Sequence, residues 1–252
     1  MPMETECDKR FVLFHEPEQG LSVNEIIRSF FQFLDEKFNP FILLLLSIII
    51  FILVNVPYAF LLNLRNHSRP FNDGLVLPDV LHKMTENANI PSLNTAAKVI
   101  FFLILGTSFI CFLLHQRRLI IFYRFLVIFS FLTILKMVVM IGTDMPDPSP
   151  NCLCYPSTAY SMSFGSALKA LFDLDGCNNL MFSSFVSFTT LCTLFWSHYF
   201  NPFVGLVYWL VTFTEALLCI FARRSYTMDV IVSLLLTLTT FELTHIWFQK
   251  KQ

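Results

Sequence analysis

The sequence predicts an all-α, polytopic membrane protein with six transmembrane helices and a cytosolic N-terminal amphipathic helix. Hydrophobic residues make up 55% of the 252 residues and charged residues only 14%, whereas soluble domains contain roughly 25% charged residues. The mean hydropathy is +0.63, which is typical of chains with several apolar spans. The formal net charge of −1 excludes a broadly basic surface, so we expect no nucleic acid as partner.

Six apolar segments are long enough to be candidate spans, because a helix needs about 20 mostly apolar residues to cross a bilayer. They cover residues 40–62, 98–114, 124–143, 180–199, 203–222 and 227–248. An even number of spans places both ends of the chain on the same side of the membrane.

Basic residues at the ends of the spans predict the orientation. Arg117 and Arg118 lie between the second and third spans, and Lys250 and Lys251 directly follow the sixth. By the positive-inside rule this side is the cytosol. The loops after the first and third spans are then lumenal, and the basic pair at 223–224 is a lumenal exception to the rule.

The chain divides into a cytosolic N-terminal segment, residues 1–39, and a membrane domain, residues 40–252. Within residues 21–39, charged residues alternate with apolar residues at helical spacing, which predicts an amphipathic helix. The apolar positions are Ile26, Ile27, Phe30, Phe31, Phe33, Leu34 and Phe38. Two placements remain open: the helix lies on the cytosolic membrane face, or it packs against the spans.

Three of the seven cysteines fall in or beside the second lumenal loop. A lumenal compartment permits disulfides, and one bridge from Cys177 to either Cys152 or Cys154 is a candidate; the absence of any bridge is the alternative. The spacing C-x-C with no nearby histidine is a poor zinc signal. We therefore predict no metal site and no cofactor.

Polar motifs gather at the lumenal ends of the predicted spans. LVLPDVLH, which contains Asp79, follows the first span, and YRFLVIFSFLTILKMVVMIGTDMPDPSPNC covers the third span and its exit. CNNLMFSSFVSFTT opens the fourth span and SYTMDVIVSLLLT the sixth. In their order and spacing these four segments resemble motifs of the sphingomyelin synthase family, a branch of the type 2 phosphatidic acid phosphatase superfamily. The resemblance covers roughly residues 40–248, and Lys136 stands where the family has an intramembrane arginine.

The resemblance also implies that this chain has lost both catalytic histidines of the family. There, one histidine attacks the donor phosphate, an aspartate orients it, and a second histidine gives a proton to the leaving oxygen. Here Phe185 and Ser225 stand at the two histidine positions, and Asp229 is the retained acid. Losing one member of such a unit usually lowers the rate by several orders of magnitude. His67 and His82 are lumenal, but nothing in the sequence places them at the site.

Two arginines directly precede Ser225. Arg223 and Arg224 offer planar forks of donors that suit phosphate, and their alternative role is contact with bilayer phosphates. We add Tyr226, Asp79 and Lys136 to this candidate lipid- and phosphate-binding set.

Two ionisable residues inside spans are expected to form a pair. A salt bridge between Asp229 and Lys136 would offset the unfavourable burial of both charges and hold the third and sixth spans together. Glu215 in the fifth span is a rival partner for Lys136.

We favour a catalytically impaired, lipid-binding or regulatory relative of sphingomyelin synthases. The resemblance implies ceramide and a glycerophospholipid as ligands, a homo- or hetero-oligomer with an active paralogue, and a Golgi, endoplasmic reticulum or plasma membrane location. One alternative is an active ceramide transferase of phosphocholine or phosphoethanolamine with relocated catalytic residues. Another is an unrelated transporter or structural membrane protein. The sequence does not decide whether the chain is an enzyme.

Overall fold

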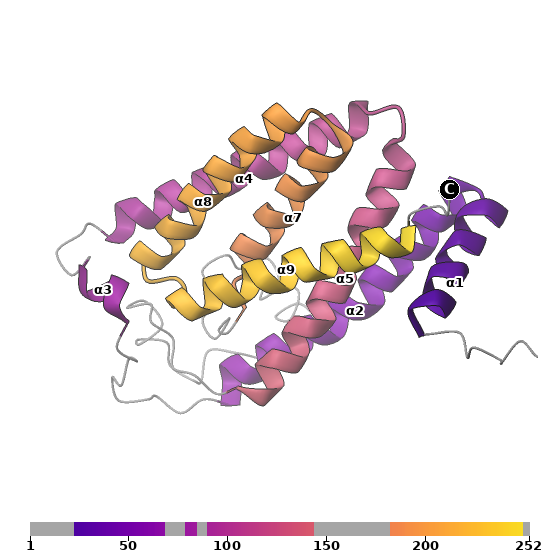
Figure 1. Cartoon of the computed structure of the whole chain (residues 1–252). Helices are drawn as coiled ribbons and strands as arrows, with labels where there is room; N and C mark the ends of the chain where they lie inside the picture. The colour runs from indigo at the N-terminus through magenta and orange to yellow at the C-terminus, as the bar shows by residue number, and fades with distance from the viewer. Residues whose placement is uncertain (1–22, 69–78, 85–89, 144–181, 249–252) are drawn as a thin grey trace, which may run out of the picture.

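The computed structural model describes residues 23–68, 79–84, 90–143 and 182–248, and the regular structure in these ranges is entirely helical (Figure 1). This confirms the predicted all-α class for the described part of the chain. The helices are α1 (Val23–Lys37), α2 (Pro40–Ser68), α3 (Val80–Met84), α4 (Ile90–Leu114), α5 (Arg118–Gly142), α7 (Ser184–Tyr199), α8 (Pro202–Phe221) and α9 (Thr227–Phe248).

Within the described residues, five helices are long and apolar enough to cross a membrane. Their apolar stretches are Pro40–Leu62, Pro91–Leu114, Arg118–Gly142, Pro202–Phe221 and Thr227–Ile246. A polytopic membrane protein is therefore supported. The fourth predicted span corresponds to α7, which has only 16 residues and rises roughly 24 Å, less than the roughly 30 Å of a hydrocarbon core. A membrane crossing by α7, the fourth of the six predicted spans, stays a prediction.

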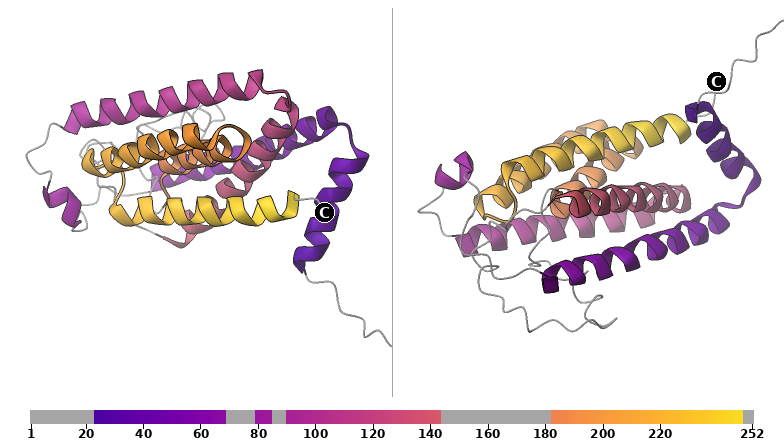
Figure 2. Two further views of the ribbon diagram at one scale, coloured as in Figure 1. Left: turned by 45° about the horizontal axis from the view of Figure 1, so that its top comes forward. Right: turned by 90° about the horizontal axis from the view of Figure 1, so that it is seen from below.

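Helix α7 occupies the interior of the bundle, where it packs against α4, α5, α8 and α9 (Figures 1 and 2). Eleven of its 16 side chains are buried. Two hydroxyls of α7 form hydrogen bonds with α8 and α9. The Ser187 hydroxyl oxygen lies 2.5 Å from that of Thr237 on α9, and the Thr193 hydroxyl oxygen lies 2.7 Å from that of Thr212 on α8. Polar groups at membrane depth need partners inside the protein, so these pairs fix how α7 faces α8 and α9.

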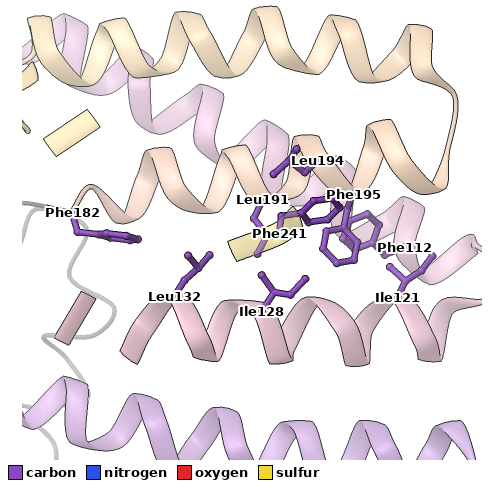
Figure 3. Close-up of a cluster of buried hydrophobic side chains, with 9 residues drawn as sticks. All are labelled: Phe112, Ile121, Ile128, Leu132, Phe182, Leu191, Leu194, Phe195 and Phe241. Atoms are coloured by element: carbon purple, nitrogen blue, oxygen red, sulfur yellow. The ribbon is translucent and has the colours of Figure 1, made fainter. Parts of the chain in front are cut away.

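The largest apolar cluster joins α7 to α4, α5 and α9 (Figure 3). Its aromatic members meet edge to face, for example Phe195 with Phe241 at 5.6 Å between ring centroids, a geometry that aromatic pairs favour. The buried members are Phe112, Ile121, Ile128, Leu132, Phe182, Leu191, Leu194, Phe195 and Phe241. This cluster holds the interior helix in place and so positions the polar ends of α7 and α9.

The α7–α8 hairpin closes through a glycine. A Cβ atom on Gly205 would lie 2.5 Å from Oγ and 2.8 Å from Cα of Ser197, distances that no side chain can occupy. Pro202 stands in the first turn of α8, and the Asn201 side chain accepts from the backbone N–H of Phe203, so the helix start is capped in the usual way.

Helix α1 contacts the bundle with one stripe and exposes another. Phe31 and Leu34 pack against the buried Leu43 and Tyr123, and α1 also lies against α9. The exposed stripe is formed by Val23, Ile26, Phe30 and Phe33. The packed placement considered from the sequence is thus observed for one stripe, while the position of α1 on a cytosolic membrane face stays a prediction.

Candidate functional site

The turn between α8 and α9 carries the two arginines in a strained backbone. The backbone N–H of Arg223 donates to the carbonyl of Ile220 at 2.9 Å, and that of Arg224 donates to Cys219 at 3.0 Å. This is the Schellman pattern that ends many helices, and it requires a left-handed residue that is usually glycine. Arg223 occupies that position with φ of 55°, a conformation unfavourable for a residue with a Cβ atom by about 1 kcal/mol.

The start of α9 is capped by Asp229. The Asp229 carboxylate accepts a hydrogen bond from the backbone N–H of Tyr226 at 2.9 Å, as the third residue of a helix does in a capping box. Asp229 is fully buried, and a negative charge near a helix N-terminus is favourable. Part of its role in this fold is therefore to define where α9 begins.

A second carboxylate reaches the same helix start from α3. The backbone N–H of Thr227 donates to Asp79 at 2.8 Å, and the Thr227 hydroxyl donates to the other carboxylate oxygen at 3.0 Å. Asp79 also accepts from the N–H of Leu81 at 3.0 Å and so begins α3 itself. The predicted phosphate ligand Asp79 is thus a carboxylate that joins α3 to α9.

An imidazole from α3 lies against Ser225. The Nε2 atom of His82 is 3.3 Å from the carbonyl oxygen of Ser225, and because a carbonyl only accepts, Nε2 is the donor. The His82 ring lies 5.6 Å from the ring of Tyr226. In return, the guanidinium of Arg223 donates to the His82 carbonyl at 3.3 Å. His82 is buried in this contact.

The pKa values of these two α3 residues are both lowered. Burial would raise the pKa of Asp79, but hydrogen bonds from Thr227 and Leu81 and the neighbouring His82 together bring it below its usual range. Burial is the main cause that lowers the pKa of His82; it outweighs Asp79 and the carbonyls of Ser225 and Ile220, which raise it. The docked α3 therefore favours a neutral imidazole beside an ionised carboxylate.

The phenyl ring of Phe185 is buried beneath one of the two arginines. The guanidinium carbon of Arg224 lies 4.0 Å from the centroid of the buried Phe185 ring, within the range of a cation–π contact. Arg224 also donates to the Asn94 side chain on α4 at 2.7 Å. Phe101 of α4 packs on the same ring at 4.5 Å between centroids. The phenyl group and its arginine are thus integrated into the packing of α4, α7 and α8.

The start of α7 packs against the first two turns of α9. The backbone N–H of Ser183 donates to the hydroxyl of Ser233 on α9 at 2.6 Å, nearly two turns into that helix. Phe185 and Val230 belong to the same apolar cluster. Phe185, Ser225 and Asp229 thus lie at the same end of the α7–α9 pair, and their assignment to the family's catalytic positions stays a prediction.

The predicted salt bridge between Asp229 and Lys136 is wrong, since no ion pair joins these two residues in the described part of the chain. The buried ammonium of Lys136 donates to the Ser184 hydroxyl and lies 5.1 Å from the centroid of the Tyr58 ring. The rival partner Glu215 instead accepts from Thr189 at 3.0 Å. The Lys136 ammonium is thus held by the Ser184 hydroxyl and the Tyr58 ring, and the Glu215 carboxylate by the Thr189 hydroxyl.

Most of the predicted residues are brought together at one end of the bundle. Asp79, Arg223, Tyr226 and Asp229 meet at the α3–α9 contact, and Lys136 lies apart on α5. The cysteines of the candidate disulfide, Cys152, Cys154 and Cys177, lie outside the described residues. Among the described side chains, no group of three His, Cys, Asp or Glu residues is arranged to hold a metal ion.

No sequence motif points to Asn94, and none places His82 at the site. His82 stands three residues after Asp79, so a contact of Asp79 with the site also brings the His82 imidazole close to it. The contact of Asn94 with Arg224 depends on how α4 packs on α8, for which no local signal exists.

Comparison with known proteins bears on the C-terminal part of the chain. Residues 176–246 match the family model described as PAP2 superfamily C-terminal. No curated protein matches the chain. The matched region contains Phe185, the α8–α9 turn and Asp229. The match supports the type 2 phosphatidic acid phosphatase superfamily for this segment, and suggests a protein related to membrane lipid phosphatases and phosphotransferases.

Proposed function

We propose that this chain is a sphingomyelin-synthase-like membrane protein that holds a phospholipid head group without transferring it. The observation that carries the proposal is the stack of Arg224 on Phe185. A phenyl ring has no lone pair with which to attack phosphorus, and here it is buried under the guanidinium at the position of the family's nucleophile. The site keeps a cation for phosphate and lacks the group that would react with it.

The strained conformation of Arg223 supports a role for its side chain. Glycine would adopt φ of 55° without penalty, so a left-handed arginine is retained at the expense of stability. Strained residues of this kind concentrate at functional sites. The Nε atom of Arg223 is buried and has no hydrogen-bond partner among the described residues, whereas Nη2 is held by His82. A phosphate oxygen would satisfy this remaining donor.

The proposed ligands are membrane lipids, ceramide or a glycerophospholipid, taken from the lumenal leaflet of a Golgi, endoplasmic reticulum or plasma membrane. A protein that binds substrate lipid without turnover can regulate an active paralogue by forming an oligomer with it. Both statements rest on the resemblance in the lumenal motifs.

Lipid retention tests the proposal. The full chain, purified in mild detergent, is extracted and its bound phospholipid and ceramide are quantified by mass spectrometry. Arg223→Gln/Arg224→Gln should reduce retention at least several-fold, because it removes both charges, while Arg223→Lys/Arg224→Lys should keep a larger share. Equal lipid content in wild type and the Gln variant would refute a head-group site at this turn.

The position of His82 favours a second candidate, an active transferase with a relocated imidazole. In that route the ceramide hydroxyl attacks phosphorus directly, since Phe185 supplies no nucleophile. His82 takes the hydroxyl proton and returns it to the diacylglycerol oxygen as that oxygen leaves. This candidate predicts turnover that His82→Asn abolishes. Turnover equal in wild type and His82→Asn would exclude this role for His82.

A further inference from the structure

A cavity lies at the end of the bundle opposite the α8–α9 turn. It has a volume of about 380 Å³ and is lined by Cys111, Leu114, His115, Gln116 and Phe200. Four of these residues end α4 or follow it directly, and Phe200 connects α7 to α8; both connections lie at the same end of the bundle (Figure 1). The cavity is an open depression on the surface rather than an enclosed pocket, and none of its lining residues belongs to the site proposed above.

The chemistry around the cavity is that of an anion site. Arg117 and Arg118 follow the lining residues in the α4–α5 turn, and both are exposed. The backbone N–H of Arg117 donates to Nδ1 of His115 at 3.0 Å. Nδ1 is therefore the acceptor nitrogen, so the neutral imidazole carries its proton on Nε2 as a donor. The Gln116 amide adds further donors, and no acidic side chain lines the cavity.

The surroundings place the cavity at a membrane–water boundary. Phe200 packs edge to face with His115 at 5.0 Å and lies 4.5 Å from Trp196, which stacks on Tyr208 at 4.6 Å between ring centroids. Aromatic clusters with polar edges are typical of this level of a bilayer. Leu114, which is 80% exposed, continues the rim of the cavity onto the lipid-facing side of α4, where acyl chains run.

We propose that this cavity binds the head group of an anionic glycerophospholipid from the leaflet on the Arg117 side. The phosphate is held by Arg117 and Arg118, and the polar head group enters the cavity beside His115 and Gln116. The acyl chains lie along the exposed apolar residues of α4. The site differs from the α8–α9 turn in position, in leaflet and in preferring negative lipids.

The test separates a built cavity from general attraction to a charged surface. The full chain is placed in nanodiscs of phosphatidylcholine with increasing phosphatidylserine, and the lipid retained after transfer to detergent is measured by native mass spectrometry. Wild type should retain phosphatidylserine over phosphatidylcholine. Arg117→Gln/Arg118→Gln should weaken that retention roughly tenfold or more, since each basic side chain contributes to attraction of anionic lipid, and Arg117→Lys/Arg118→Lys should preserve most of it.

The decisive variant fills the cavity without changing charge. Cys111→Phe should weaken phosphatidylserine retention about as much as loss of the two arginines, and Leu114→Trp at the rim provides a second filling variant if the first does not fold. Leu210→Phe adds similar bulk to an exposed residue of α8, outside the lining and away from the acyl-chain surface of α4, and should have no effect. Undiminished retention in the filling variants, or equal retention of the two lipids by wild type, would overturn the site.

Discussion

Asp79 on α3 accepts hydrogen bonds from both the backbone N–H and the hydroxyl of Thr227, 148 residues further along the chain. This contact fixes the N-terminus of α3 to the first residue of α9, two residues after Ser225. Together with the reciprocal contacts of His82 and Arg223, it makes α3 a wall of the candidate site.

Removing the Asp79 carboxylate should loosen this wall. We expect Asp79→Ala to destabilise the protein by about 1 kcal/mol, the usual effect of losing a helix cap, because the Thr227 N–H loses its acceptor. Thermal unfolding in detergent measures the change. Asp79→Asn retains an oxygen acceptor and should be milder; an equal loss in both variants would show that charge rather than capping matters.

Relieving the strain at Arg223 should separate stability from binding. Arg223→Gly removes the left-handed penalty and should raise stability by about 1 kcal/mol, while the loss of the guanidinium lowers lipid retention. Arg223→Gln keeps the penalty and should lower retention without the gain. The prediction is wrong if the glycine variant is less stable than the glutamine variant, or if it retains as much lipid as wild type.

Acid should release α3 from the turn. Because the pKa of His82 is lowered in the folded protein, docking is complete above the ordinary histidine pKa of about 6.5 and weakens as the pH falls below it. The lowered pKa of Asp79 adds a second loss at still lower pH. The hydrogen-exchange rate of residues 79–84, corrected for the intrinsic rate, should rise as the pH is lowered from 8 to 5. In His82→Gln the step near neutrality should disappear; tighter docking in acid would contradict the account.

Two of the three glycines in the spans, Gly205 and Gly106, offer a matched pair. Gly205→Ala would bring a methyl group against the backbone of Ser197, so we expect lower stability and poor recovery of folded protein. A Cβ atom on Gly106 meets nothing within 4 Å, and Gly106→Ala should be neutral or stabilising by up to about 1 kcal/mol. The two alanine variants are compared by their size-exclusion profiles and melting temperatures. Equal behaviour would mean that α7 and α8 are not held at this close approach.

Local features of the sequence predict most of the spans. Apolar runs of about 20 residues depend only on neighbours in the chain, and five of the six predicted spans correspond to helices of the described residues that are long and apolar enough to cross a membrane. The ends of helices were less accurate: α4 begins at Ile90, eight residues before its predicted start. Pro91 in its first turn is the signal that marks this start.

Contacts between distant segments were not predictable in the same way. The pairing of Lys136 with Ser184, of Arg224 with Phe185, and of His82 with Ser225 depends on which faces the packed helices turn to each other. Charge alone predicts Asp229 as the partner of Lys136, whereas the hydroxyl that Ser184 presents on α7 binds the ammonium instead. Where a side chain has several possible partners, helix packing determines which partner it contacts.

The most direct test of a head-group site without catalysis is turnover. Purified wild-type protein, incubated with labelled ceramide and phosphatidylcholine, should form no more labelled sphingomyelin than a mock preparation. Phe185→His/Ser225→His, which restores both imidazoles, is the companion variant in which any regained turnover would support the register. Turnover by wild type that Asp229→Asn abolishes would contradict the account.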